Sequence, residues 1–294
     1  MTDNRFLDRL AGGEVLVSDG ATGTNLQQQG LPVGAAAEAW VLDNPEAILN
    51  LNRAFIDAGS DILLTCTFGG TKLRLSASNL EDQFESINRK AVEITRQAVQ
   101  GQDVLVAGSI GPTGHMLAPL GTVSAAEAEE NYREQARVLI ENGVDLVVVE
   151  TQFDINEALA AIRGVRAVDP EIPLVCSFSY DRGTRTMMGV KPDDMAAQIG
   201  SAEVNVLGIN CGRSLSENLG ALTRLNDVTD KPIWFKPNAG LPEMDDEGKP
   251  TYSVSPKEMG ALVPAWTEAG ARIVGGCCGT SPAHLAAIAR AVKA

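Results

Sequence analysis

Basic residues are in short supply in this sequence. Lysine and arginine total 24 against 38 aspartate and glutamate residues, so the formal net charge at pH 7 is −14. Sequence-independent binding to nucleic acid or to an anionic membrane needs a basic surface, and we therefore expect neither partner. With 294 residues, of which 44% are hydrophobic, the chain is long enough to bury a full core.

Long hydrophobic runs and a paired set of cysteines are also missing. No apolar run approaches the roughly 18 residues that span a bilayer, and the first residues, Met1 to Arg5, lack a signal-peptide pattern. We therefore expect a cytoplasmic protein. Five cysteines are present, an odd number, and Cys277 and Cys278 are adjacent. This is a poor disulfide framework and is typical of a reducing compartment, where thiols serve metals or catalysis.

What the sequence does contain is a series of short apolar runs rich in β-branched residues. Continuous apolar runs, in contrast to alternating ones, are typical of strands buried on both faces of a parallel sheet. Helical periodicity fills the intervals, and several of these segments open with capping signals such as Ser255-Pro-Lys-Glu258. The predicted strands are 14–18, 61–67, 104–110, 145–151, 173–180, 205–210, 232–237 and 271–275.

The regular alternation of strands and helices predicts an α/β fold, a single (β/α)8 TIM barrel over residues 1–294. Strand starts are about 37 residues apart on average, and a barrel of this kind has about 250 residues. The alternative is a doubly wound open sheet. No G-x-G-x-x-G motif opens the first helix, which makes this alternative the weaker one.

In a barrel, the residues that follow the strands share the catalytic face. Three unusually long segments, 21–44, 111–123 and 239–254, follow strands and are therefore expected there. Cys211 follows the sixth predicted strand, while Cys277 and Cys278 follow the eighth. Because only the seventh strand separates these two in a closed barrel, the three thiols are expected within reach of one small ion.

Three thiolate donors without a fourth protein ligand indicate Zn²⁺ with one open coordination position, as in catalytic zinc sites. Two interpretations of the cysteines that involve no metal remain. A lone cysteine such as Cys66 or Cys176 is more often a small buried hydrophobe. The adjacent pair Cys277 and Cys278 can alternatively form a strained vicinal disulfide.

The expected chemistry follows from the charge of such a centre. Zinc with three thiolates carries a net negative charge, which makes it a poor activator of water but a suitable partner for a substrate thiol. Coordination deprotonates that thiol, whose free pKa is about 8.5, and leaves the sulfur nucleophilic. The sequence therefore predicts alkyl transfer onto sulfur.

Several motifs together resemble the homocysteine S-methyltransferase family, and most closely the homocysteine-binding domain of cobalamin-dependent methionine synthase. The likeness extends from about Asp19 to Ala287, and its Asn-Cys-Gly and Gly-Gly-Cys-Cys-Gly elements are highly specific. The motifs are Asp19-Gly-Ala-Thr-Gly-Thr24, Thr67-Phe68-Gly69, Gly111-Pro112-Thr113, Glu150-Thr151, Gly208-Ile-Asn-Cys-Gly212, Pro237-Asn-Ala-Gly-Leu-Pro242 and Gly275-Gly-Cys-Cys-Gly-Thr280.

The resemblance implies an enzyme that methylates homocysteine to methionine. It implies that Asp19 and Glu150 bind the ammonium group of homocysteine, and that backbone N–H groups around Gly20 and Ala21 face its carboxylate. The homocysteine thiol takes the open position on Zn²⁺. The implied zinc ligands are Cys211, Cys277 and Cys278.

Five further positions lie near these motifs or are candidates for ligands. We expect Phe68 to wall the substrate pocket, and Asn238 either to contact the substrate or to orient a loop. Cys66 departs from the family, which commonly has Asn there. Of the two histidines, His115 falls on a rim loop, and His284 is expected on the surface of the last helix.

The resemblance leaves two candidates for the methyl donor. Neither histidine has the Asp-x-His-x-x-Gly context of a cobalamin-binding module, so the resemblance favours a methylated corrinoid carried by a partner protein. S-methylmethionine or a betaine is the alternative donor. A different class of function, a zinc- and thiol-binding subunit without catalysis, predicts thiol binding without turnover.

Overall fold

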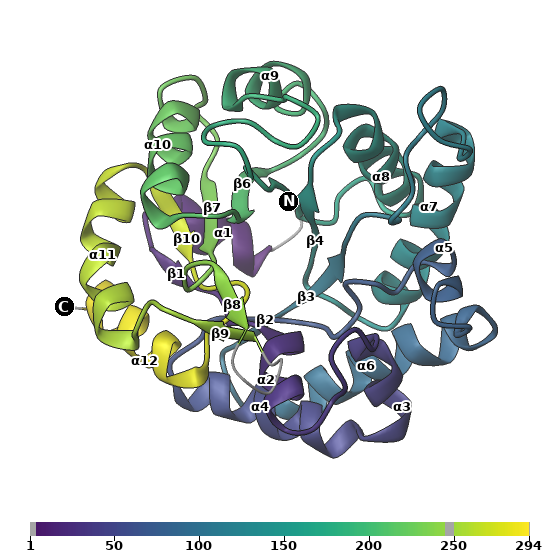
Figure 1. Ribbon diagram of the computed structural model, residues 1–294, viewed down its shortest axis with the longest axis horizontal. Helices are drawn as coiled ribbons and strands as arrows, with labels where there is room; N and C mark the ends of the chain where they lie inside the picture. The colour runs from purple at the N-terminus through teal and green to yellow at the C-terminus, as the bar shows by residue number, and fades with distance from the viewer. Residues whose placement is uncertain (1–3, 245–249, 294) are drawn as a thin grey trace.

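The computed structural model describes residues 4–244 and 250–293 and contains the predicted (β/α)8 barrel (Figure 1). Its parallel strands follow the order β1-β10-β7-β6-β5-β4-β3-β2, and a bridge between Ser18 and Ile62 joins the two ends of the sheet. Each predicted strand overlaps one strand of the barrel. The strands are β1 (Leu16–Val17), β2 (Ile62–Leu64), β3 (Leu105–Ile110), β4 (Leu146–Gln152), β5 (Leu174–Phe178), β6 (Val206–Cys211), β7 (Ile233–Pro237) and β10 (Ala271–Val274).

Helices surround the strands in a ring, as Figure 1 shows. None of those in the described ranges has the length and apolarity needed to cross a membrane. The larger helices of the ring are α4 (Pro45–Asp57), α6 (Phe84–Ala98), α7 (Ala125–Glu141), α8 (Ile155–Val168), α10 (Leu215–Asn226), α11 (Pro256–Glu268) and α12 (Pro282–Val292). The shorter elements are α1 (Arg5–Ala11), α2 (Thr22–Gln28), η1 (Ala37–Ala39), α3 (Trp40–Asp43), α5 (Lys72–Ser76), η2 (Glu81–Gln83) and α9 (Pro192–Gln198).

Two apolar cores hold the barrel together. The larger core packs the outer faces of the strands against the helices, and the smaller one fills the interior of the barrel. Helix α1 adds Phe6 to the interior core, where Phe6 is 1% exposed beside residues such as Trp234. Burial of such side chains is the main favourable term in folding.

The interior changes from apolar to polar along the strands. Side chains in a strand alternate between its two faces, so the residues two positions beyond the interior core also point inward. On β4 this places Glu150 above Val148, and on β7 it places Lys236 above Trp234. A polar layer therefore tops the apolar core. Its members are Ser109, Glu150, Ser177, Asn210 and Lys236.

The long segments after the strands form the face of the barrel at this polar layer. Segment 21–44 contains α2, η1 and α3. Segment 239–254 contains an antiparallel hairpin of β8 (Pro242–Met244) and β9 (Pro250–Tyr252), while its residues 245–249 lie outside the described ranges.

The last helix corrects one expectation. The predicted surface position of His284 is wrong, because this residue is only 8% exposed. Its Nδ1 atom accepts a hydrogen bond from Ser281 N at 3.1 Å, and its Nε2 atom donates to Val254 O at 2.9 Å. His284 therefore caps α12 and ties it to the segment before α11. By contrast, the predicted capping box of Ser255 and Glu258 is confirmed.

Candidate functional site

The three cysteines that the sequence places at one rim do meet there. Cys211 ends β6, while Cys277 and Cys278 follow β10, and both strands flank β7. The three sulfurs all lie within 4.8 Å of one another, and the Sγ atoms of Cys211 and Cys277 are 2.9 Å apart. No His, Asp or Glu side chain joins this group in the described ranges. The cluster can therefore supply three ligands to one metal ion.

A strained turn aims Cys211 at the other two cysteines. Cys211 has a φ of 57°, a left-handed conformation that non-glycine residues seldom adopt, and Gly212 follows with a φ of 80°. Asn218 Nδ2 donates to Cys211 O at 2.6 Å, and Asn238 Nδ2 donates to Gly212 O at 2.8 Å. A Cβ atom at Gly212 would approach Asn218 to 2.2 Å, so the turn requires glycine. Asn238 does not line the cavity described below.

Backbone and hydroxyl groups hold the other two cysteines. Cys277 N donates to Pro237 O at 2.9 Å, and Ala239 N donates to Cys278 O at 3.0 Å, which fixes this loop to the end of β7. Thr280 Oγ1 donates to Cys277 O at 2.7 Å. The approach of Thr280 leaves no room for a side chain at position 276, where a Cβ atom would lie 2.4 Å from Thr280.

Asn210 joins three strand ends next to the cluster. Its Oδ1 accepts hydrogen bonds from Thr151 N at 2.9 Å and from Ser177 Oγ at 2.6 Å, and its Nδ2 donates to Thr151 Oγ1 at 2.7 Å. Thr151 itself has a φ of 61°. Asn210 thus ties the end of β6, where Cys211 lies, to the left-handed backbone at Thr151 of β4 and to Ser177 of β5.

The three thiols of the cluster differ in pKa. Hydrogen bonds from Cys211 and Cys277 lower the pKa of Cys278, so the first proton leaves there. Hydrogen bonds to its neighbours and burial raise the pKa of Cys211. The pKa of Cys277 is raised to about 12, because the bond with Cys278 and burial outweigh the lowering effect of Cys211. A metal ion that binds here must displace the remaining protons.

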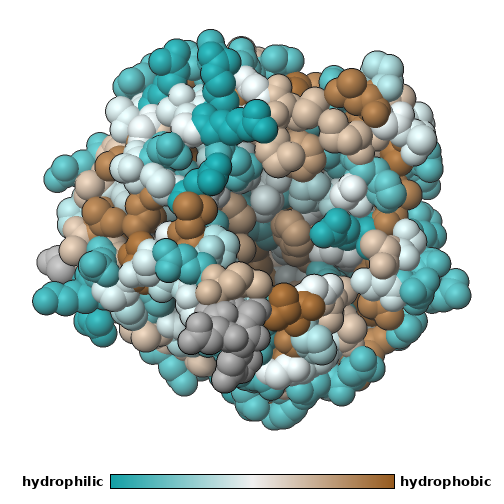
Figure 2. All heavy atoms as spheres, viewed as in Figure 1, coloured by the Kyte–Doolittle hydropathy of each residue, from teal (hydrophilic) through white to brown (hydrophobic). Residues whose placement is uncertain are grey.

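The sulfurs open into a cavity of about 750 Å³ at the mouth of the barrel. Figure 2 shows this hollow at the centre of the face that is seen in Figure 1. Of the predicted substrate residues, Phe68 lies on its wall with 38% exposure, and Gly20 and Ala21 also line it. The backbone N–H of Ala21 points to Thr280, whose carbonyl oxygen and Oγ1 lie 3.3 and 3.1 Å away.

Glu150 lines the floor of the same cavity. It is 7% exposed, and its Oε1 accepts a hydrogen bond from Ser109 Oγ at 2.5 Å. Burial raises the pKa of Glu150 to about 7, although Lys236 opposes this shift. A cation that enters the cavity would favour the ionised carboxylate.

Asp19 occupies a different place from Glu150. It is 1% exposed and does not line the cavity. Its Oδ1 accepts a hydrogen bond from Lys236 Nζ at 2.6 Å, and its Oδ2 accepts one from Leu64 N at 2.8 Å. Both carboxylate oxygens are thus engaged within the protein.

Lys236 lines the cavity as well, although no motif in the sequence indicates a role for it. Burial lowers the pKa of Lys236, but the carboxylates of Asp19 and Glu150 raise it by more. The net shift is upward, so Lys236 stays protonated. The signal in the sequence is a single charged residue in the inward-facing register of an otherwise apolar strand.

The remaining cysteines are buried thiols, as their sequence context predicts. Cys176 is 0% and Cys66 5% exposed, and all five cysteines are free. Cys66 also lines the cavity. Burial, reinforced by the carboxylate of Glu38, raises the pKa of Cys66 well above its usual value.

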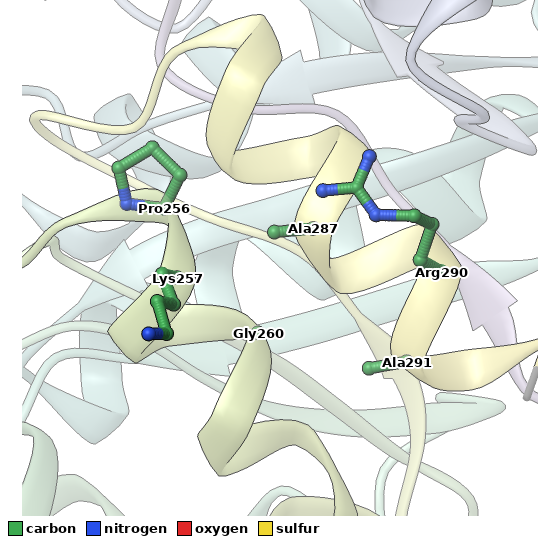
Figure 3. A pocket seen from close by; sticks show the side chains of 6 residues that line it. All are labelled: Pro256, Lys257, Gly260, Ala287, Arg290 and Ala291. Carbon is green, nitrogen blue, oxygen red and sulfur yellow. The ribbon is translucent and has the colours of Figure 1, made fainter.

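A second hollow lies outside the barrel, between α11 and α12 (Figure 3). None of the predicted site residues lines it. Its lining residues are Pro256, Lys257, Gly260, Ala287, Arg290 and Ala291.

Comparison with known proteins finds relatives that match nearly the whole chain. Residues 16–292 match the family model described as homocysteine S-methyltransferase. Methionine synthase of Mycobacterium tuberculosis is 30% identical over 99% of this chain, and that of Mycobacterium leprae is 29% identical over the same share. The chain spans about a quarter of the length of these two relatives.

Solved structures with the same fold include the homocysteine methyltransferase MmuM from Escherichia coli. Its metallated form superposes with a TM-score of 0.81 and 28% identity, covering 97% of this chain and 98% of MmuM. Its apo form gives a TM-score of 0.75 with 27% identity, covering 96% of this chain and 97% of MmuM. Because the family model matches nearly the whole of this chain, the chain belongs to the homocysteine S-methyltransferase family.

Proposed function

We propose that this chain holds one Zn²⁺ through Cys211, Cys277 and Cys278 and methylates the thiol of homocysteine to give methionine. The observation that carries the proposal is the convergence of three sulfurs within 4.8 Å, without another metal-binding side chain in their group across the described residues. Soft thiolate donors suit zinc, and a set of three leaves a position for a substrate. The existence of a metallated form of MmuM supports a metal in this fold.

Zinc in this position would supply a thiolate at neutral pH, because metal coordination removes the proton of a bound thiol. That proton leaves to solvent. In the transfer, the sulfur forms a bond to the methyl carbon, and the donor keeps the electron pair of the bond that breaks.

The side chains of this protein position the substrate. Glu150 lines the cavity together with the cysteines and offers a carboxylate to the ammonium group of homocysteine. Its bond to Ser109 fixes the orientation of that carboxylate. Phe68 walls the cavity. Such fixed geometry lowers the entropic cost of reaching the transition state.

The proposed donor is a methylated corrinoid on a partner protein. Support comes from the two methionine synthases, of which this chain spans about a quarter. A small donor such as S-methylmethionine or a betaine is the second candidate. It is favoured by the cavity volume of about 750 Å³, which leaves space beside one amino acid.

The test combines metal analysis with donor assays. Purified protein is loaded with zinc, and homocysteine consumption is followed with methylcobalamin, S-methylmethionine and betaine in parallel. Methionine is the expected product with methylcobalamin. If homocysteine binds but no free donor supports turnover, the small-donor alternative is wrong, and the result favours a zinc- and thiol-binding subunit that does not act alone. If homocysteine does not bind at all, the proposed function is wrong.

A further inference from the structure

Lys236 is a buried cation that lines the cavity, and its ammonium group has more N–H donors than it has acceptors in the described residues. Its side chain is 3% exposed, and its Nζ lies 2.6 Å from Asp19 Oδ1 and 5.6 Å from the ring centroid of Trp234. An ammonium group has three N–H donors. Within the described residues, Asp19 is the one hydrogen-bond acceptor of this ammonium group.

The position of Lys236 directs the remaining donors. Trp234 lies one layer deeper in the interior of the barrel, and Asp19, in the segment after β1, accepts a hydrogen bond from the ammonium group. The residue lines the cavity, whereas Asp19 does not. A buried N–H group without an acceptor is costly, so the site is suited to a ligand that brings an anionic oxygen.

Glu150 provides the complementary charge in the same cavity. It comes from β4 and Lys236 from β7, both in the polar layer that tops the interior core. The two groups interact electrostatically, since each alters the pKa of the other. The cavity thus presents one anion and one cation near the metal-binding sulfurs, which is the pattern that matches a zwitterionic amino-acid thiol.

One of the other expected carboxylate donors is already engaged within the protein. The N–H of Ala21 is already directed at Thr280. The helix that follows it, α2, has only seven residues, so its N-terminus makes a weak anion site.

We propose that Lys236 binds the carboxylate of the substrate thiol, and that Asp19 is a positioning residue that acts through Lys236 instead of contacting the substrate ammonium. This inference rests on the proposed function, and it names the group that selects amino-acid thiols over simple ones. It also explains why Asp19 lies outside the cavity lining while Lys236 lies in it.

The test measures binding of three thiols to the zinc-loaded protein by calorimetry. Homocysteine carries both charges, 3-aminopropane-1-thiol lacks the carboxylate, and 4-mercaptobutanoate lacks the ammonium group. In Lys236→Met, we expect homocysteine and 4-mercaptobutanoate to bind roughly 10- to 100-fold more weakly, the usual effect of losing a charged hydrogen bond. Binding of 3-aminopropane-1-thiol should stay within about threefold of wild type.

Further variants keep the test decisive. Lys236→Met leaves Asp19 buried without its cation, so the double variant with Asp19→Asn removes both charges and should show the same selective loss. Lys236→Arg should recover part of the affinity for homocysteine. Lys72→Met, which removes a lysine on the outside of the barrel, is the matched control. Zinc content should be unchanged in all of them.

The outcomes separate the two proposals. Equal weakening of all three thiols, or unchanged homocysteine binding in the double variant, overturns the role of Lys236 and leaves the proposed function standing. If the wild-type protein binds zinc but none of the thiols, both proposals fail.

Discussion

Cys211 and Cys277 lie 66 positions apart in the chain, yet their Sγ atoms are 2.9 Å from each other. Closure of the barrel brings them together, because β6 and β10 flank the same strand, β7. The left-handed backbone at Cys211 then turns its sulfur toward the loop after β10. Strain of this kind persists where surrounding contacts hold it, and here Asn218 and Asn238 bind the turn.

Replacement of Cys211 by Ser should strip the metal. Two thiolates remain, and an alcohol is a much poorer zinc ligand than a thiolate. Zinc per protein, measured by plasma emission after dialysis, should fall from about one to near zero. Cys176→Ala removes a buried thiol outside the cluster and should keep its zinc. Full zinc in Cys211→Ser would count against the ligand assignment.

Zinc affinity should fall as the pH drops. The pKa of Cys277 is raised to about 12 and that of Cys211 is also raised, so both carry protons at neutral pH that zinc must displace. Protons therefore compete with the metal, and affinity should decrease by about 10- to 100-fold per pH unit between pH 8 and pH 6. Chelator competition at the two ends of this range measures the slope. A flat profile would mean that thiolate formation is not linked to metal binding.

Replacement of Glu150 by Gln should weaken homocysteine much more than propane-1-thiol. The carboxylate attracts the ammonium group of homocysteine, whereas the alkyl thiol has no such group. We expect a loss of about 10-fold or more for homocysteine and less than about threefold for propane-1-thiol. Competition between the two thiols for the zinc-loaded protein checks this difference. Equal weakening would remove Glu150 from the ammonium site.

Removal of Asn210 should cost stability as well as metal affinity. In Asn210→Ala, the N–H of Thr151 and the hydroxyl of Ser177 lose their buried acceptor, with an expected cost of about 2–4 kcal/mol in the free energy of unfolding. Urea unfolding of the metal-free protein measures it. Asn142→Ala, at the end of α7, should cost less than about 1 kcal/mol. Wild-type zinc affinity in Asn210→Ala would show that this residue does not support the Cys211 turn.

The strands and the cysteine cluster could be predicted because both depend on repeated or chemically unusual patterns. Apolar runs bounded by glycine and polar residues locate the strands, and strand order in a barrel then fixes which ends are neighbours. Cys211 and the Cys277 and Cys278 pair follow directly from this logic, since closure needs no knowledge of side-chain contacts.

What the sequence did not predict are partnerships between buried polar groups. Asp19 is expected at a strand end, but only the packed structure shows that its carboxylate accepts a hydrogen bond from Lys236. His284 has the spacing of a surface residue on α12, yet its two nitrogens are used for a cap and for a contact to Val254. Such pairings depend on three-dimensional distances that neither periodicity nor motif spacing contains.

The central claim is that three cysteines hold zinc and leave one position for the substrate sulfur. X-ray absorption at the zinc edge, recorded on the loaded protein before and after addition of homocysteine, tests it most directly. The account predicts three sulfur ligands at about 2.3 Å that become four when homocysteine binds. An unchanged count of sulfur ligands in the presence of bound homocysteine would contradict it.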